Sequence, residues 1–297
     1  MIITGKKFSK PDLSRIVNGD TVLPDAPETP KKIRLDHLLV QQHPEYNRSS
    51  LQTFIKSGFV KVNGEAVTKP NTKVLPEAEI TLSIPEAAEL PPLPPVIYED
   101  EHVLVINKPT GLLSMAKGEY CPEPTLEDYG LLVHRLDRDT SGVVILAKDL
   151  ATQKMLRKQF QDRKTHKTYY ALVEGKPQLN EALIDLPIAR NLKHPTTFQV
   201  DQNGKPSQTY YKVIQQNDKY SLLELKPTTG RTHQLRVHLK YLGTPIVGDI
   251  VYGDGKGKRL FLHAKELEIT IPGKNGGERK IFTAELPEEF THVFQEK

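Results

Sequence analysis

The chain has 297 residues, of which 37% are hydrophobic and 26% charged, and its formal net charge is +4. This length suits about two domains and is enough to bury a full core. No apolar run is long enough to span a bilayer, and the first residues lack the charged-then-apolar pattern of a secretion signal, so we expect a cytoplasmic protein without a membrane partner. The single cysteine, Cys121, excludes an internal disulfide framework and is typical of a reducing compartment.

Residues 1–30 contain four prolines and no clear period, and we interpret them as an N-terminal extension. Residues 31–85 are predicted to form a small α/β domain. Apolar residues at helical spacing predict one helix over 33–39 and a second that begins near Arg48 and ends at Gly58. Residues 59–67 are predicted to form a hairpin with Asn63-Gly64 as its tight turn, and 79–84 a last strand.

The small domain carries a surplus of cations, with eight Lys or Arg against five Asp or Glu. Its two helices and hairpin resemble the alpha-L RNA-binding motif, which occurs in a small-subunit ribosomal protein and in many RNA-modifying enzymes. The resemblance implies RNA contacts near the helix ends and the hairpin, at Arg34, Arg48, Lys56 and Lys61. The alternative is a solvated basic face, which is the usual meaning of a run of charges. The order of helices and hairpin favours RNA binding.

Residues 86–95 contain four prolines in ten positions, too many for a helix or a central strand, and predict a semi-rigid linker. The second domain is predicted to span 96–297. Its predicted strands are 103–106, 143–147, 167–175, 209–214, 220–226, 267–271 and 280–284, and residues 176–206 are expected to be irregular. A helix capped by Asp149 is predicted to run to Phe160, and its basic outer face would either track phosphates or solubilise the protein.

A dense polar block, His134-Arg135-Leu136-Asp137-Arg138-Asp139-Thr140-Ser141-Gly142, separates two apolar runs of this domain. A loop without function is expected to carry mainly Gly, Asn and Ser rather than two arginines and two aspartates. The neighbouring arginines would keep Asp137 ionised, and a positioned carboxylate can act as nucleophile or general base. The alternative is a structural loop whose aspartates cap backbone amides, and the nine residues alone do not decide between the two.

This block resembles the signature of the RluA family of RNA pseudouridine synthases, in which the aspartate at the position of Asp137 is catalytic. The resemblance extends from about residue 33 to 286 and includes 107–111, 167–175 with Tyr169 at the position of the active-site tyrosine, and 227–238. The connection from residue 111 to the block is shorter than is usual in the family, which alters the expected rim of the cleft. The substrate contacts that the resemblance implies are at Lys108, His134, Arg135 and Leu235.

Thr229 is predicted to cap a helix with Arg231 in its first turn. Because the helix dipole is positive at that end, an arginine there needs a nearby anion. The family supplies one, the catalytic aspartate, so Arg231 is predicted to pair with Asp137.

The sequence therefore predicts an α+β protein, with a mixed, mostly antiparallel sheet in a catalytic domain of the pseudouridine synthase fold. The resemblance implies a monomeric enzyme that converts uridine to pseudouridine in a structured RNA without a cofactor, with ribosomal RNA as the first expectation and transfer RNA as the alternative. Asp137, Tyr169 and Arg231 are the expected catalytic residues, with Tyr169 stacked on the uracil and Arg135 holding the flipped uridine. Whether Asp137 attacks ribose, attacks uracil or only removes a proton stays open.

Three alternatives fit the sequence less well than this interpretation. A non-catalytic RNA-binding or assembly factor would not need the set of Asp137, Tyr169 and Arg231. A carboxylate-based glycosidase normally needs two opposed carboxyl groups, and Asp139 is the nearest candidate for the second. His233 and His238 are five positions apart, not the four that place two imidazoles on one helical face, so we expect no metal site.

Overall fold

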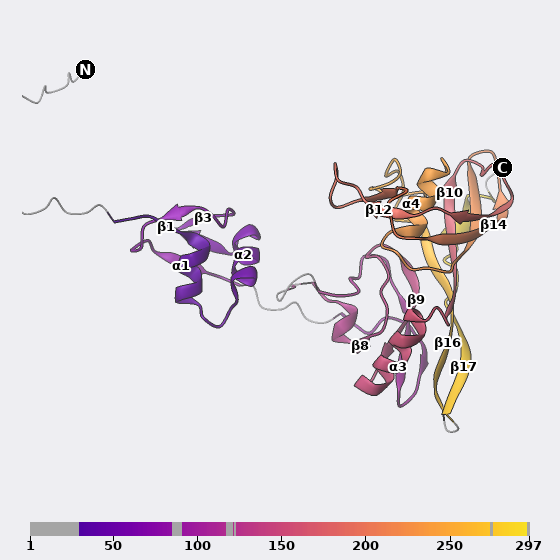
Figure 1. Ribbon diagram of the computed structural model, residues 1–297, viewed down its shortest axis with the longest axis horizontal. Helices are drawn as coiled ribbons and strands as arrows, with labels where there is room; N and C mark the ends of the chain where they lie inside the picture. The colour runs from indigo at the N-terminus through magenta and orange to yellow at the C-terminus, as the bar shows by residue number, and fades with distance from the viewer. Residues whose placement is uncertain (1–29, 85–90, 117–120, 122, 274–275, 296–297) are drawn as a thin grey trace, which may run out of the picture. The chain divides into compact units, whose positions relative to one another are not determined.

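We describe residues 30–84, 91–116, 121, 123–273 and 276–295 of a computed structural model (Figure 1). The chain divides into two compact units, Met1–Ser83 and Ile84–Lys297. The expected extension, 1–30, lies outside the described residues except for its last position, and so do positions 86–90 of the expected linker. The domain boundaries drawn from the sequence therefore stay predictions.

The first unit contains the two predicted helices and the predicted hairpin. Its elements are β1 (Ile33–Arg34), α1 (Leu35–Gln42), α2 (Arg48–Lys56), β2 (Val60–Val62), β3 (Glu65–Ala66), β4 (Lys73–Val74) and β5 (Ile80–Leu82). The side chain of Asn47 caps α2 by accepting a hydrogen bond from the backbone N–H of Ser50. Asn63 and Gly64 take the positive φ values, 51° and 83°, that a tight hairpin turn requires. The first helix begins at Leu35 rather than Ile33, because Ile33–Arg34 pairs with β4.

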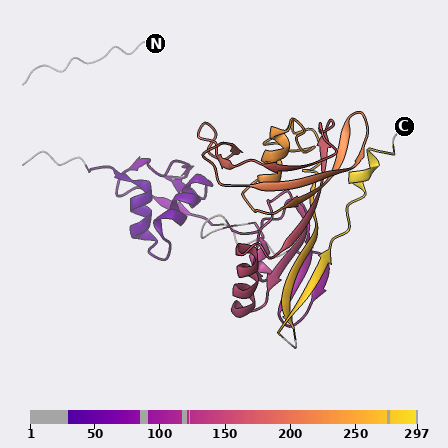
Figure 2. The same cartoon turned by 45° about the vertical axis from the view of Figure 1, so that its right-hand side comes forward.

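The second unit is built on one large sheet (Figures 1 and 2). Its elements are β6 (Val96–Glu99), β7 (Val103–Lys108), a 3-10 helix η2 (Leu126–Asp128), β8 (Leu131–Leu132), β9 (Ser141–Ala147), α3 (Leu150–Gln161), β10 (His166–Glu174), β11 (Glu181–Asp185), β12 (Ile188–Arg190), β13 (Phe198–Val200), β14 (Gln208–Gln216), β15 (Tyr220–Pro227), α4 (Gln234–Tyr241), β16 (Leu262–Gly273), β17 (Gly276–Thr283) and α5 (Glu289–His292).

Ten strands form this sheet in the order β11-β14-β15-β10-β16-β9-β7-β6, with β17 paired to β16 and β8 to β9. The pairing of β9 with β16 is parallel, and the other pairings within the described sheet are antiparallel. The predicted α+β class with a mixed, mostly antiparallel sheet is confirmed.

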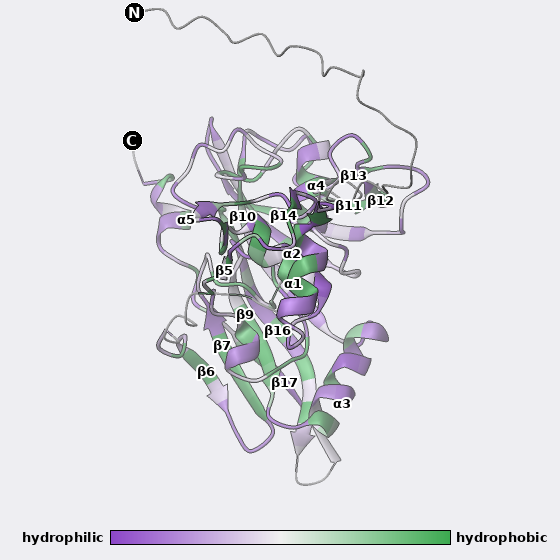
Figure 3. Cartoon of the chain, turned by 90° about the vertical axis from the view of Figure 1, so that its left-hand side faces the viewer, coloured by the Kyte–Doolittle hydropathy of each residue, from purple (hydrophilic) through white to green (hydrophobic). Residues whose placement is uncertain are grey.

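Helices cover parts of this sheet through their apolar stripes. Leu156 of α3 is fully buried among side chains of β7, β9 and β16, whereas most of α3 is hydrophilic (Figure 3). Leu235 and Leu239 of α4 join a second core with β10 and β15. The polar loop before β9 therefore leads into a strand that is buried on both faces, which gives it a rigid base.

The expectation that residues 176–206 are irregular is wrong, because β11, β12 and β13 lie in this span. β11 extends the large sheet by pairing with β14, and β12 pairs with β13 as a separate ribbon. Ile188 packs in a small cluster with Val237 of α4, so the ribbon is held by tertiary contacts. The prolines of this span, at positions 177, 187, 195 and 206, lie in the connections between the strands.

Candidate active site

The loop that carries Asp137 joins β8 to β9 and is placed by the sheet. Gly142 has φ = 114°, and a Cβ atom there would collide with the backbone of Ala264, so the position requires glycine. Ala264 in β16 pairs with Gly142 on one side and with Tyr169 of β10 on the other. The sheet therefore places Gly142, at the end of the Asp137 loop, on one side of Ala264 and Tyr169 on the other.

Lys108 anchors this loop from the interior and does not face a substrate. Its side chain is fully buried, and Nζ donates to the carbonyls of Pro109, Leu112 and Arg138 at 2.9, 2.8 and 2.7 Å. Burial lowers the pKa of Lys108 to about 7, while the three acceptors match the three donors of an ammonium group. We therefore correct its expected role from substrate contact to support of the loop backbone.

His134 has a packing role beside the cavity, and its expected substrate contact stays a prediction. Its ring stacks on Phe160 with 4.6 Å between centroids, and its Nε2 accepts a hydrogen bond from the N–H of Ile145 at 3.2 Å. Burial lowers the pKa of His134 to about 3, so the ring is neutral at pH 7. The neutral ring ties the start of the loop to β9 and α3.

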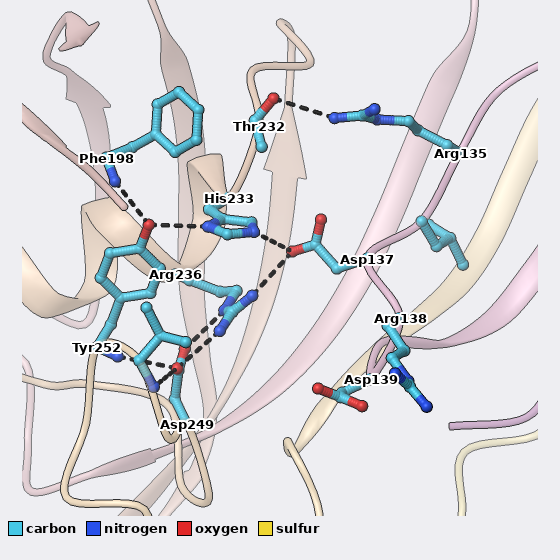
Figure 4. Close-up of polar contacts among 12 residues, drawn as sticks. Arg135, Asp137, Arg138, Asp139, Phe198, Thr232, His233, Arg236, Asp249 and Tyr252 are labelled. Carbon is cyan, nitrogen blue, oxygen red and sulfur yellow. Dashed lines mark hydrogen bonds and ion pairs between the residues drawn. The ribbon is translucent and has the colours of Figure 1, made fainter. Parts of the chain in front are cut away.

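Asp137 is held by an arginine that is itself held by a second aspartate (Figure 4). Nη1 of Arg236 donates to Oδ2 of Asp137 at 3.2 Å, while its Nε and Nη2 donate to the two oxygens of Asp249 at 2.7 and 2.8 Å. The Asp249 side chain is fully buried, and that of Asp137 is 25% exposed. Burial opposes the charge on Arg236, but the hydrogen bonds and charge of Asp249 raise its pKa, and Asp137 raises it further. The cluster therefore presents one partly exposed carboxylate beside a permanently charged guanidinium.

The predicted pairing of Arg231 with Asp137 is wrong, because Arg236 makes that pair. α4 begins at Gln234, so Arg231 precedes the helix and Arg236 lies in its first turn. Nε of Arg231 donates instead to the carbonyl of Pro206 at 3.2 Å. An arginine in the first turn of a helix needs a nearby anion because the helix dipole is positive there, and in α4 that arginine is Arg236.

The later start of α4 has a local cause. The hydroxyl of Thr229 donates to Oε1 of Gln234 at 2.8 Å, and the backbone N–H of Arg231 donates to the same oxygen at 3.0 Å. Nε2 of Gln234 donates to the carbonyl of Gln208 at 2.9 Å. Thr229 thus binds a side chain of the helix rather than capping its backbone, and the segment between them forms a turn.

His233 is the residue that precedes α4, and its backbone is left-handed with φ = 55°. Its Nδ1 lies 2.8 Å from the hydroxyl of Tyr252, and its Nε2 lies 3.9 Å from Oδ2 of Asp137 (Figure 4). Burial lowers the pKa of His233, although Asp137 acts in the opposite direction. A left-handed non-glycine residue is uncommon, and one beside a cavity suggests a functional constraint.

A cavity of about 520 Å³ opens over these residues. Asp137, Tyr169, Leu235, Arg135 and Arg231 all line it, as do His134 and His233. A cavity of this size can hold a small organic group. Burial and the charge of Asp137 raise the pKa of Tyr169, so its hydroxyl is protonated. Arg135 is exposed at the wall and donates to the hydroxyl of Thr232 at 3.2 Å.

The four cations expected to bind RNA in the first unit fall into two pairs. Arg34 and Arg48 both donate to the buried carboxylate of Asp36, with shortest distances of 2.9 Å each. These hydrogen bonds outweigh burial and lower the pKa of Asp36 far below its usual range. Lys56 and Lys61 are exposed. Arg34 and Arg48 therefore have a structural task in addition to any contact with RNA.

Four residues of the site had no role in the sequence-based prediction: Arg236, Asp249, His233 and Tyr252. Asp249 and Tyr252 lie within the span of the family resemblance, 33 to 286, but the resemblance assigned no role to either residue. Arg236 could have been found by treating each arginine of 227–238 as a candidate for the first turn of the helix.

Within the ranges described above, no helix is long and apolar enough to cross a membrane. The same residues contain no cluster of three His, Cys, Asp or Glu side chains that could hold a metal ion.

The chain is similar to known families and proteins over most of its length. Residues 102–241 match the RNA pseudouridylate synthase family, and residues 33–80 match the S4 domain. An uncharacterized RNA pseudouridine synthase of Aquifex aeolicus is 36% identical over 88% of this chain and 92% of its own length. The ribosomal large subunit pseudouridine synthase D of Nitrosomonas europaea is 34% identical over 98% of this chain and 93% of its own.

A solved structure is also similar. The human RNA pseudouridylate synthase domain containing 4 protein has a TM-score of 0.54 and 26% identity, over 68% of this chain and 92% of its own.

Proposed function

Because the chain belongs to the RluA family of RNA pseudouridine synthases, we propose that it isomerises specific uridines of ribosomal RNA and that Asp137 is its catalytic residue. The ribosomal target is supported by relatives named ribosomal large subunit pseudouridine synthase C and D, which are 34% identical to this chain in two cases. Transfer RNA is the alternative target.

The reaction breaks the bond between the ribose and nitrogen 1 of uracil, turns the base, and rejoins it through carbon 5. It is neutral in redox terms and consumes no water, so an ionised carboxylate and proton transfers meet its chemical needs. We therefore expect activity without an added cofactor. Asp137 supplies the carboxylate, and Arg236 orients it through the hydrogen bond of 3.2 Å.

The observation that carries the assignment of Asp137 is its position as the exposed member of the cluster with Arg236 and Asp249. Asp249 is fully buried and accepts from both Nε and Nη2 of Arg236, so it cannot reach a substrate. This argues against a glycosidase built on Asp137 and Asp249, which would need both carboxyl groups free at the substrate.

Tyr169 and Arg135 complete the proposed site from two sides of the cavity. Tyr169, held in β10, is protonated beside Asp137, and its ring offers an aromatic face to the uracil. Arg135 is exposed and can follow the phosphate backbone or fill the space that a flipped uridine leaves in its helix. Leu235 adds an apolar wall.

The test uses RNA that carries tritium at carbon 5 of uridine. The expected result is tritium release with the base retained, from a ribosomal RNA fragment and not from transfer RNA. Asp137→Asn keeps the size of the side chain but removes its charge, so it should bind RNA and release no tritium. Free uracil would indicate a hydrolase, and binding without either product would indicate a non-catalytic factor.

A further inference from the structure

We propose that His233 is a second positioning residue for Asp137, and that Tyr252 holds it with its proton on Nε2. The proposal rests on the catalytic role of Asp137. The His233 contact differs from the Arg236 contact because the His233 ring is a neutral donor, and the hydroxyl of Tyr252 sets the orientation of that ring.

Two donors approach the same oxygen of Asp137. Nη1 of Arg236 lies 3.2 Å from Oδ2, and Nε2 of His233 lies 3.9 Å from it. His233 is the residue before α4, and Arg236 lies in the first turn of that helix. Figure 4 shows the other oxygen of Asp137 turned away from both. Donors on one side only would fix the carboxylate while leaving its second oxygen for the reacting nucleoside.

The hydrogen bonds of Tyr252 favour one tautomer of His233. The hydroxyl oxygen of Tyr252 accepts from the backbone N–H of Phe198 at 2.9 Å. Its own proton is then free to be donated to Nδ1 of His233, 2.8 Å away. A ring that accepts at Nδ1 carries its proton on Nε2, which is the nitrogen that faces Asp137. The opposite tautomer would place a lone pair against the carboxylate.

Burial favours the neutral ring of His233 and lowers its pKa. Among the charged neighbours, the anions Asp137 and Asp249 act against this shift, and the cations Arg236 and Arg135 act with it. The guanidinium of Arg236 also lies 5.1 Å from the centre of the Tyr252 ring, which fixes the tyrosine that orients His233. The left-handed backbone at His233, φ = 55°, is the conformational cost of this placement.

The separation of 3.9 Å is longer than a hydrogen bond. Catalytic hydrogen bonds are often long before substrate binds and shorten in the complex. The network also reaches Phe198 of β13, so a substrate that contacts the β12–β13 ribbon would act on the same tyrosine that orients His233. We expect the His233–Asp137 contact to become a hydrogen bond when RNA is bound.

The first experiment reads the tautomer without RNA, by nitrogen-15 NMR of the histidine side chains of the full chain at pH 7.5. His233 should be protonated on Nε2 and bare on Nδ1. Tyr252→Phe removes the donor to Nδ1 and should move the population toward protonation on Nδ1. A wild-type ring protonated on Nδ1, or a tautomer that Tyr252→Phe leaves unchanged, overturns the proposal.

The second experiment compares single-turnover tritium release with RNA affinity. His233→Phe should slow release about tenfold or more, because a misplaced catalytic group is costly, and should change affinity less than about twofold. His233→Gln places an amide donor near the position of Nε2 and should recover most of the rate. Exposed His194→Phe is the matched control and should match wild type.

Equal rates for wild type and His233→Phe, or a His233→Gln as slow as His233→Phe, would refute the positioning role. Should His233→Phe not fold, His233→Gln and the NMR measurement on Tyr252→Phe still decide the matter. A wild-type protein that releases no tritium would contradict the proposed function and not the tautomer, which is measured independently.

Discussion

Asp137 and Arg236 lie 99 positions apart in the chain and meet with 3.2 Å between Oδ2 and Nη1. The same guanidinium holds the buried Asp249 through two further hydrogen bonds, so one side chain connects the loop before β9, the start of α4 and the segment after it. Arg236 is thus needed both for the fold around the site and for the orientation of the carboxylate.

Arg236→Met should remove activity and stability together, whereas Arg231→Met should not. The first change leaves Asp249 buried without its counter-ion, which costs about 3–5 kcal/mol of unfolding free energy. The single-turnover rate should fall about 100-fold or more, as expected when a catalytic group loses its orientation. Arg231→Met, which removes a cavity-wall cation bonded to Pro206, should lower RNA affinity more than rate. Urea unfolding and tritium release on both variants test this, and equal effects of the two would be incompatible with the pairing described here.

The placement of this pair shows what the sequence could and could not predict. Local signals were sufficient for the elements: Asp149 caps α3 as predicted, and Asn63-Gly64 forms the predicted turn. The predicted start of α4 was wrong because the hydroxyl of Thr229 donates to the side chain of Gln234 and does not cap the helix. The spacing of apolar residues in the sequence does not reveal this hydrogen bond. An error of a few residues in the helix start moved the predicted ion pair from Arg236 to Arg231.

Lys108→Met should destabilise the second unit and impair catalysis without touching the cavity. The substitution leaves the carbonyls of Pro109, Leu112 and Arg138 without their buried donor. Unsatisfied buried acceptors cost about 1–3 kcal/mol each, although some will find water. We expect a lower urea midpoint and a lower rate with RNA affinity nearly unchanged. Exposed Lys154→Met is the control, and a similar midpoint for both variants would show that Lys108 does not support the loop.

The lowered pKa of His134 should make the folded protein less stable as the pH falls. Its pKa is lowered to about 3 in the folded protein, against the ordinary value of 6.5. Between these values the unfolded chain binds a proton that the folded chain does not, so stability falls as the pH is lowered from 6.5 toward 3. The slope from this group is about 1.4 kcal/mol per pH unit. His134→Phe keeps an aromatic ring on Phe160 but cannot be protonated.

The free energy of unfolding of wild type minus that of His134→Phe should therefore be highest near pH 7 and should fall as the pH is lowered. Urea unfolding at a series of pH values measures it, and other titrating groups cancel because both proteins contain them. A difference that stays constant from pH 7 to pH 4 would mean that the ring is not buried in its neutral form.

The burial of the expected site residues was harder to predict than the helices and strands, for a physical reason. A motif fixes residue types along the chain but not which side chains point inward. Lys108 is fully buried beneath the loop, whereas Arg135, in the same set of expected contacts, is exposed at the cavity wall. Burial depends on the packing of β7 against β9, which only the three-dimensional arrangement supplies.

In the first unit, Lys56 and Lys61 should act on RNA affinity alone. Both are exposed, so replacing them with alanine should leave the unfolding transition unchanged and weaken RNA binding. Arg34 and Arg48 share the buried Asp36, so their replacement should also destabilise the unit. Circular dichroism melts and filter binding on the two double variants separate the effects. Equal reductions of stability would show that the two pairs do not differ in role.

Removing residues 1–90 should leave a catalytic unit that folds and reacts but binds RNA more weakly. The cut keeps Pro91, whose carbonyl accepts a hydrogen bond from the hydroxyl of Tyr129 at 2.8 Å. Asp137, Tyr169 and Arg236 all lie beyond the cut, so single-turnover rates at saturating enzyme should be close to those of the full chain.

Each RNA phosphate that the first unit neutralises in the full chain adds about 0.7 to 0.9 to the slope of log affinity against log salt, so the shortened protein should show a shallower slope. Salt titrations of the full and shortened proteins measure this slope. Equal slopes and affinities would mean that the first unit does not bind this RNA. A folded fragment without single-turnover activity would mean that the first unit helps to form the active site.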